Sequence, residues 1–538
     1  MIEPIIKNIE INNHKLIKQV GFANIVSGIE IPILLDKNVN SFDLKITFTC
    51  DIKKIRLANY TWRIPKQNII IPEYSNKIIQ LENGLYFQPE TAIGIWEINK
   101  AVPNTLLWRF NPIGANKITS YKCEEDFKHY ENVKSVFGPD LKLKLLFSKN
   151  GALEISRSKI PFSSIMCFTD HCDFDTPELL VKQRIFFNKN NIRTTKGFFL
   201  NHFSKRNDNA SWKHDQSELS NWVADGHELC YHSLSQSLKS DEESFQDFKN
   251  FTPPIPASTW IDHGYQPYNL SLLSKSKINE NDYATILKSK KINILWNYVD
   301  SGTATSGVIN QLNPNDFTLK SFWKGIRNKS LKQKISLFIK NAIVHYYADE
   351  NLIRNYTQLA SGFKKIIKTK APKDLYKFIK ASSKVIVPLA KIIFGWKKIK
   401  NTVYPNAKYS PVFFEHTIGQ EQFIIFQTLE LLDFKNALDK PSIDKFIAEN
   451  GLFIGHTYFA VPMKYHDGKI FDNQETINPI VESNFCYIAQ KIENNQIWNP
   501  TLVELVAAWK DFTSTKIGVV NQEFVIIQNN NLPFRKIT

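Results

Sequence analysis

Aspartate and histidine residues follow several short apolar runs in the middle of the chain. Residues 169–173 (TDHCD) follow the run PFSSIMCF, and residues 232–236 (HSLSQ) follow HELCY. The same kinds of side chain occur, after or within further apolar runs, at Asp262, His263, Asp300 and His456. Imidazole and carboxylate groups bind cations such as Zn²⁺ and also act as general acids and bases. A lone histidine is more often structural, but five run ends that each carry Asp or His favour one shared hydrolytic metal site.

The apolar runs have the spacing of strands that alternate with helices. From about Ile160 they are short and are separated by longer amphipathic segments. Thr176-Pro177-Glu178 predicts the start of one helix, because Thr is a favoured N-cap and Pro fits the first turn. Repeated β-α units form a parallel sheet, and the carboxyl ends of its strands share one face. The polar residues at the run ends are therefore expected to converge.

Four short motifs occur in a fixed order after the TDHCD segment. They are Thr176-Pro177, Phe198-Phe199, Gly226-His227-Glu228 and His232-Ser233. In this order they resemble the motifs of the polysaccharide deacetylases, the NodB-homology or carbohydrate esterase family 4 group. The resemblance covers roughly residues 160–300, with a weaker match around His456. It implies a distorted β/α-barrel, a divalent metal that is usually zinc, and the removal of N-acetyl groups from sugars.

The chain departs from this family at the positions that would bind the metal. The family's Asp-Asp pair corresponds either to Thr169-Asp170, with Asp170 as a ligand and no base, or to Asp170-His171. In the second register Asp170 is the general base and His171 is a ligand. Gln236 stands where the family has a second histidine, and an amide is a poor zinc ligand. His263 is available at another run end and is expected to replace it.

These considerations predict one preferred set of site residues. The predicted metal ligands are His171, His232 and His263. Asp170 is the predicted base, and His456, which matches the family's late histidine, is the predicted acid for the leaving amine. Residues expected to orient the ligands or to replace one of them are Asp173, Gln236, Asp262 and Asp300.

The chain divides into three parts with different sequence patterns. Residues 1–155 show short alternating runs punctuated by Pro, Asn and Gly, which predicts a β-rich accessory domain. Residues 156–316 and 409–538 carry the β-α pattern and predict the deacetylase-like barrel. Residues 317–408 hold 21 Lys and Arg against 3 Asp and Glu, a net charge of +18 in a chain whose total is +16. This segment is expected to be a helical insertion with a function of its own.

The basic insertion has three interpretations. Its lysines recur beside apolar residues, which is typical of helices that lie on an anionic membrane surface. The alternative is a solvated, lysine-rich helical cap. Nucleic acid is not an expected partner, because no recognised binding motif is present. The N-terminal sequence lacks the apolar core of a signal peptide, which predicts a cytoplasmic location. If the insertion binds the membrane, the protein is expected to attach peripherally to the inner membrane.

The sequence thus predicts a zinc-dependent hydrolase acting on carbon-nitrogen bonds other than peptides. Its expected substrate is an N-acetylated amino sugar in a bacterial surface polysaccharide or in a lipid-linked precursor. The alternative is a carbohydrate-binding member of the same fold that has lost its metal and its activity.

Overall fold

The structure is a computed structural model of the 538-residue chain. It describes residues 5–11, 17–20, 23–25, 27–35, 39–112, 117–121, 128–134, 137, 140–204, 206–235, 239–261, 273, 278–297, 307–369, 372–460, 469–473, 475–528 and 531–538.

The N-terminal part of the chain folds into two antiparallel sheets that share one apolar core. In β5 (Phe42–Phe48) buried and half-buried residues alternate, because successive side chains of a strand point to opposite faces. The first sheet has the order β1 (Ile6–Ile11), β5, β12 (Thr105–Phe110), β11 (Ile95–Ile98), β8 (Ile69–Ile71). The second has the order β2 (Ile17–Val20), β4 (Gly28–Leu35), β15 (Asp140–Ser148), β10 (Tyr86–Pro89), β9 (Ile79–Leu81), β6 (Ile52–Arg56), β7 (Trp62–Arg63), with β3 (Ala23–Ile25) beside β4. Buried residues of both sheets, such as Leu44 and Leu145, belong to the shared core.

A ten-stranded mixed sheet forms the second part of the fold. In chain order its strands are β17 (Ser164–Asp170), β18 (Thr195–Phe198), β19 (Glu228–Tyr231), β20 (Thr259–Trp260), β21 (Ile294–Trp296), β22 (Phe413–Ile418), β23 (Glu421–Phe426), β24 (Leu429–Glu430), β25 (Leu452–Thr457) and β26 (Ile497–Trp498). In space the order is β22-β23-β21-β20-β19-β18-β17-β25-β24, with β26 also beside β17. Both faces of β17 are buried: Met166 and Phe168 belong to one core, Ile165 and Cys167 to another.

The predicted distorted β/α-barrel is wrong. The mixed sheet is a curled half-barrel whose described path ends at β22 and β24, and β22 pairs with β23 in antiparallel orientation. Together with the antiparallel N-terminal sheets, this makes the molecule β-rich. Alternating β and α segments predict parallel neighbours, but closure depends on strand number, tilt and register, which a local pattern does not specify.

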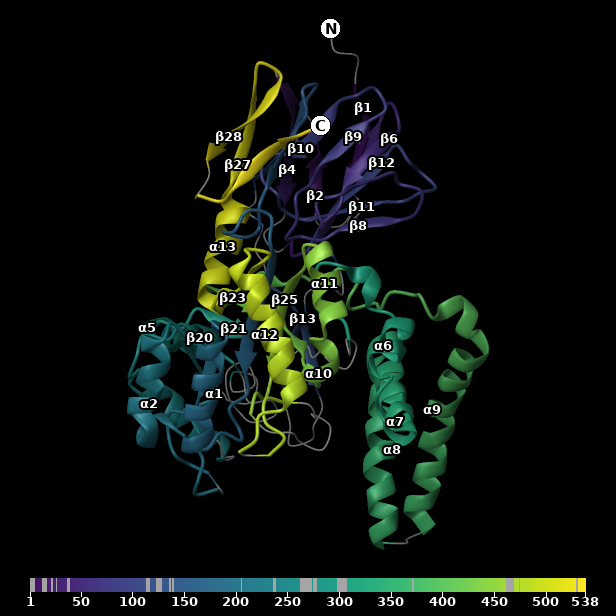
Figure 1. Cartoon of the computed structure of the whole chain (residues 1–538). Coiled ribbons are helices and arrows are strands. Elements are labelled where there is room, and N and C mark those ends of the chain that lie inside the picture. Colours follow the sequence, from purple (N-terminus) through teal and green to yellow (C-terminus); the bar gives the residue numbers. More distant parts are fainter. Residues whose placement is uncertain are drawn as a thin grey trace.

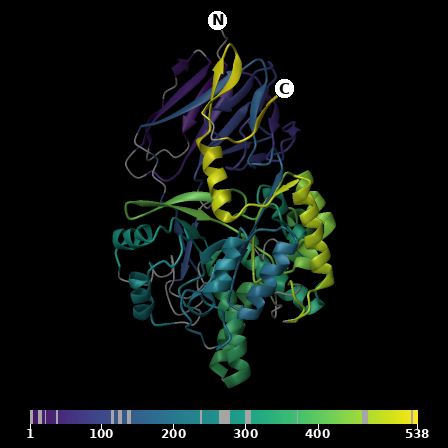
Figure 2. The same cartoon turned by 60° about the vertical axis from the view of Figure 1, so that its left-hand side comes forward.

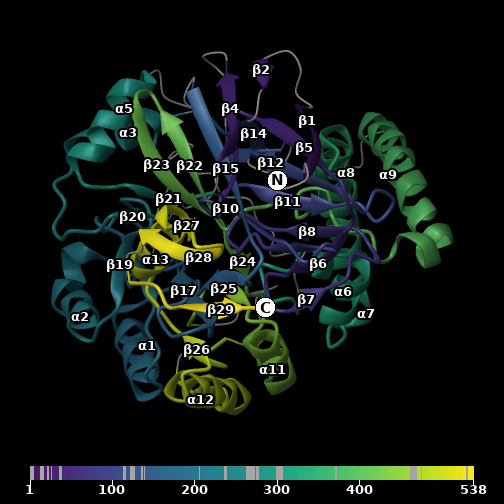
Figure 3. The same ribbon diagram turned by 90° about the horizontal axis from the view of Figure 1, so that it is seen from above.

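Helices cover the mixed sheet and surround it when the molecule is seen from above (Figure 3). The helix α1 (Pro177–Lys189) begins as the sequence predicts, because the side chain of Thr176 caps it by accepting from the amide of Leu179. The remaining helices of this part are α2 (Trp212–Ala224), α3 (Asp241–Asn250), α5 (Glu280–Ser289), α10 (Phe434–Ala437), α11 (Lys440–Ala448), α12 (Pro479–Glu493) and α13 (Leu502–Ser514).

The basic segment is helical in the structure and projects from the molecule as a hairpin (Figure 1). After a short 3₁₀ turn at Pro314–Asp316, it contains α6 (Leu319–Gly325), α7 (Leu331–Asn341), a π-helical segment η3 (Ala342–Tyr347), α8 (Glu350–Thr369) and α9 (Pro372–Ile399). Among the described residues, no helix combines the length and the apolar character needed to span a bilayer.

Three sheet elements connect the N-terminal sandwich to the rest of the chain. The strand β16 (Ala152–Ile155) pairs with the C-terminal strand β29 (Phe534–Ile537). The hairpin of β27 (Lys516–Val520) and β28 (Glu523–Gln528) rises beside the sandwich strands (Figure 2). The hairpin of β13 (Lys117–Tyr121) and β14 (Lys128–Asn132) contacts the mixed sheet. There the backbone amide of Thr119 donates to Oδ1 of Asn297, which follows β21, at 3.0 Å.

Candidate metal centre

Three potential ligands lie at the carboxyl ends of neighbouring parallel strands. His171 and Asp173 follow β17, and His232 follows β19. Both strands pair in parallel with β18, which lies between them. Their carboxyl ends therefore meet at one edge of the sheet, as the sequence pattern predicts.

The ligand atoms of these residues are close enough to share one cation. Nε2 of His232 lies 3.3 Å from Nδ1 of His171 and 3.1 Å from Oδ2 of Asp173, and the third separation is 3.9 Å. Ligands about 2.0–2.1 Å from a tetrahedral zinc ion are about 3.3 Å apart, so the donor set fits such an ion. Asp173 and His232 are buried, and His171 is half-buried. The group could therefore hold a metal ion.

Aromatic rings pack around the side chain of His171. Its ring lies 3.9 Å from that of His456 and 4.8 Å from that of Tyr458, centroid to centroid. The ring of Trp296 lies 4.6 Å from that of His456. Nδ1 of His456 lies 2.8 Å from the hydroxyl oxygen of Thr169, and the same hydroxyl lies 3.3 Å from the carbonyl oxygen of Gly455. The contact with Thr169 holds the ring of His456 in one orientation, with Nδ1 turned toward the hydroxyl.

A buried group of charges lies directly behind the ligands. The ammonium of Lys196, in β18, contacts the carboxylates of both Asp170 and Asp175, and all three side chains are buried. Gln183 holds Asp175 by donating to its Oδ1 at 2.6 Å. Burial raises the pKa of Asp170 to about 7, and the charge of Lys196 opposes this rise. Burial by itself would lower the pKa of Lys196, but the two carboxylates outweigh it and raise that pKa, so Lys196 stays charged.

The small size of Gly197 lets the strands approach each other beneath the site. A Cβ atom at this position would lie 3.0 Å from the carbonyl oxygen of Asp170 and 3.3 Å from Cβ of His232. A side chain at this position would crowd the backbone of Asp170 on one side and the potential ligand His232 on the other. Gly197 thus lets the end of β18 lie close to both neighbouring segments.

The predicted site residues have different outcomes. His171 and His232 come together, and the third potential ligand among the described residues is Asp173, which the sequence suggested as an orienting group or alternative ligand. Asp170 points to Lys196 instead of joining the three ligands, and His456 lies against His171. The remaining predictions fall on residues outside the described part of the chain: Gln236, Asp262, His263 and Asp300.

Several residues of the site were missed from the sequence, among them Asp175, Trp296 and Tyr458. Lys196 and Gly197 were missed as well, and both stand in the run TKGFFL, where a lysine interrupts an otherwise apolar strand. A charged residue in a buried strand requires a partner of opposite charge, so this lysine was a signal that a carboxylate lies beside it.

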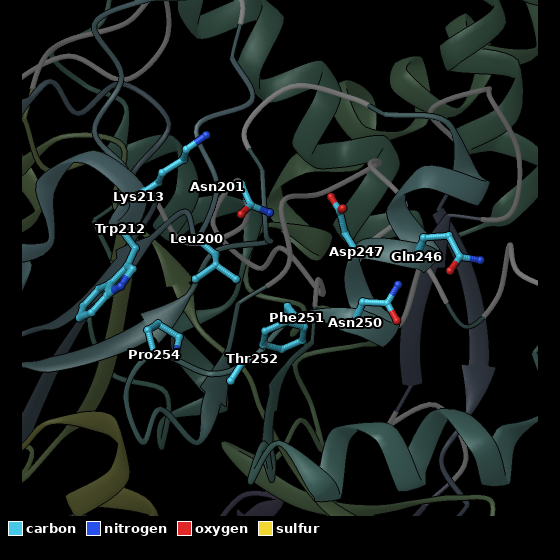
Figure 4. A pocket seen from close by; sticks show the side chains of 10 residues that line it. All are labelled: Leu200, Asn201, Trp212, Lys213, Gln246, Asp247, Asn250, Phe251, Thr252 and Pro254. Atoms are coloured by element: carbon cyan, nitrogen blue, oxygen red, sulfur yellow. The ribbon is translucent and has the colours of Figure 1, made fainter.

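A cavity of about 550 Å³ opens near the same edge of the sheet (Figure 4). Leu200 and Asn201, which follow β18, form part of its lining, and the amide of Asn201 donates to the carbonyl of Leu234 at 2.7 Å. This bond ties the cavity to the segment that follows His232. The other lining residues come from the start of α2 and the end of α3: Trp212, Lys213, Gln246, Asp247, Asn250, Phe251, Thr252 and Pro254. Amide groups and aromatic rings together can contact the hydroxyls and the apolar faces of a polar ligand.

Comparison of the chain with protein-family models and with curated proteins finds no match.

Proposed function

We propose that the chain is a metal-dependent hydrolase that removes N-acetyl groups from an amino sugar in a bacterial surface polysaccharide or in its lipid-linked precursor. The observation that carries this proposal is the convergence of His171, Asp173 and His232. Two imidazoles and one carboxylate are a ligand set of catalytic zinc sites, which keep a further position for water or substrate. Bound there, zinc would polarise a carbonyl oxygen and lower the pKa of water to about 7.

Asp170 is the proposed general base. Its Oδ2 is held by Lys196, whereas its buried Oδ1 accepts no hydrogen bond from the residues that the structure describes. Oδ1 is therefore the atom that can accept a proton. The contact with Lys196 holds the carboxyl group in one orientation, as a base that must act at a defined place requires.

His456 is the proposed acid for the leaving amine. Its Nδ1 is engaged by the hydroxyl of Thr169, so Nε2 is the nitrogen proposed to carry the proton for the amine. The tilted ring contacts of His456 with His171 and Trp296 keep the ring beside the potential ligands. Amide hydrolysis needs such an acid, because an amine leaves only after its nitrogen is protonated.

The substrate class is proposed from the resemblance to the polysaccharide deacetylases and from the cavity beside Asn201. The cavity combines amide side chains with Trp212 and Phe251, groups suited to a sugar chain. The runner-up is a glycan-binding protein without activity, which would need no metal and would release no acetate.

The test measures metal and product on the same preparation. The full-length protein is analysed for bound metals, and acetate release is measured on a soluble oligosaccharide of N-acetylglucosamine. We expect stoichiometric zinc, acetate release, loss of release after chelation and recovery when zinc returns. Glycan binding without metal and without acetate would contradict the proposal and support the runner-up.

A further inference from the structure

The helix α9 carries a third of the basic residues of the basic segment on one element. It contains seven lysines and a single acidic residue, Asp374. Asp374 offsets only one of the seven lysine charges, so the helix keeps a strong net positive charge. Such a charge attracts an anionic surface.

One face of α9 is packed against the neighbouring helices. Val385 and Ile392 are buried on this face, and Val385 shares a small core with Ile343 and Leu352. The hydroxyl of Tyr347 donates to the carbonyl of Pro388 at 2.7 Å, which ties α9 to η3. The orientation of the helix about its own axis is thereby determined.

The opposite face of α9 is apolar and exposed. Ile386, Val387, Ile393 and Phe394 are 60%, 56%, 70% and 90% exposed. The second pair follows the first by seven residues, two helical turns, so the four side chains form one continuous stripe. Figure 1 shows α9 at the outer edge of the molecule, on the far side of α7 and α8 from the mixed sheet.

A row of lysines runs beside this stripe. Lys384, Lys391 and Lys398 are exposed and also repeat every seven residues. At 100° per residue they lie on one flank of the stripe, while Lys397 lies within it near the end of the helix. Lysine ammonium groups at the border of an apolar stripe can reach lipid phosphates while the stripe enters the acyl region.

We infer that the outer face of α9 docks on the surface of an anionic phospholipid bilayer, with the helix lying in the plane of the interface. Charge favours lipid over a second copy of the chain, because two copies would bring two segments of net charge +18 together. The exposed Phe394 favours lipid over nucleic acid, whose phosphates need no apolar stripe. This inference does not depend on the proposed hydrolase activity.

The experiment is co-sedimentation of the full-length protein with vesicles. One set contains equal parts of phosphatidylglycerol and phosphatidylcholine, and the other contains phosphatidylcholine alone. We expect the protein to pellet with the anionic vesicles only and to be released when salt rises from about 0.1 M to about 1 M, since salt screens exposed charges. If the protein does not pellet with anionic vesicles at low salt, the inference is overturned.

Two variants separate the roles of charge and of the apolar stripe. Lys384→Gln/Lys391→Gln/Lys398→Gln and Ile393→Ser/Phe394→Ser should each lower vesicle binding at least ~10-fold, since each removes several favourable contacts with the interface. The matched control Lys100→Gln/Lys149→Gln/Lys516→Gln removes the same charge from exposed lysines elsewhere and should bind as the wild type does.

Folding and self-association are checked on the same samples. Circular dichroism should be unchanged, because all substituted side chains are exposed, and Ile386→Ser/Val387→Ser provides a second test of the stripe. Wild-type binding by either the lysine variant or both stripe variants would overturn the inference. The inference would also be overturned if the protein bound no vesicles but formed a dimer in ultracentrifugation, and if Ile393→Ser/Phe394→Ser dissociated that dimer.

Discussion

The Nε2 atom of His232 lies 3.1 Å from the Oδ2 atom of Asp173, although 59 residues separate the two in the chain. The parallel pairing of β17, β18 and β19 brings the two segments to one sheet edge. The buried side chain of Asn209 then holds the loop by donating to the carbonyl of Asp173 at 2.9 Å. The contact between His232 and Asp173 is therefore imposed by the surrounding fold, and it leaves both groups positioned to bind the same cation.

Replacing His232 tests the metal centre. His232→Ala removes one of three ligands, so we expect it to lose zinc and to abolish acetate release. Elemental analysis and an acetate assay measure the two effects. His214→Ala is the matched control, because His214 is exposed and lies outside the ligand group, and it should retain both metal and activity. Full metal occupancy in His232→Ala would refute the ligand assignment.

Replacing Asp170 separates a base from a ligand. Asp170→Asn should retain zinc and lose roughly 10²–10⁴-fold in rate, the usual contribution of general acid–base catalysis. Asp175→Asn also removes a carboxylate from Lys196, but it should keep most of the rate. Reduced metal content in Asp170→Asn would make Asp170 a ligand, and an unchanged rate would exclude it as the base.

The buried ion group of Lys196 predicts a large effect on stability. Lys196→Met leaves two buried carboxylates without their cation, which should lower the free energy of unfolding by about 3–5 kcal/mol. Urea unfolding followed by circular dichroism measures the change. Adding Asp170→Asn and Asp175→Asn to the same variant should restore much of the loss, since no unpaired charge remains. The control is Lys149→Met, because Lys149 is exposed. If Lys149→Met lowered the free energy of unfolding as much as Lys196→Met does, burial of the ion group would not be the cause of the effect.

His416 predicts a pH dependence of stability far from the metal centre. Burial lowers the pKa of His416 from 6.5 to about 4, helped by Lys134 and opposed by Glu280 and Glu131. Between these pH values the unfolded chain binds more protons at this position than the folded chain does. The contribution of His416, up to about 3 kcal/mol, is therefore present above pH 6.5 and is lost as the pH falls toward 4.

The variant His416→Asn tests this dependence. Nδ1 of His416 accepts from the amide of Lys134 at 3.1 Å, and the Asn Oδ1 can replace this acceptor without titrating. The unfolding free energy of the variant should fall less steeply than that of the wild type between pH 6.5 and pH 4. Parallel curves would contradict the prediction, and His214→Asn, at an exposed position, should give a curve parallel to the wild type.

Much of the local structure follows from the sequence alone. The Thr176 cap, the strand that ends at Asp170 and the placement of His171 and His232 at strand ends depend on interactions between residues close in the chain. A cap needs one hydroxyl and one nearby amide, and a buried strand needs a short apolar run, so both can be read from spacing. The concentration of positive charge in residues 317–408 is likewise a property of the sequence.

The tertiary structure decided the remaining features. Whether the mixed sheet closes depends on tilt, register and the antiparallel β22–β23 pair, none of which leaves a periodic signal, so the barrel was predicted wrongly. Asp173 joins the ligands because a loop turns its carboxylate toward His232, and the pairing of Lys196 with Asp170 spans separate strands. Contacts of this kind depend on where the whole core places each residue in space. Residue type and spacing in the sequence only narrow the set of residues that could form the site.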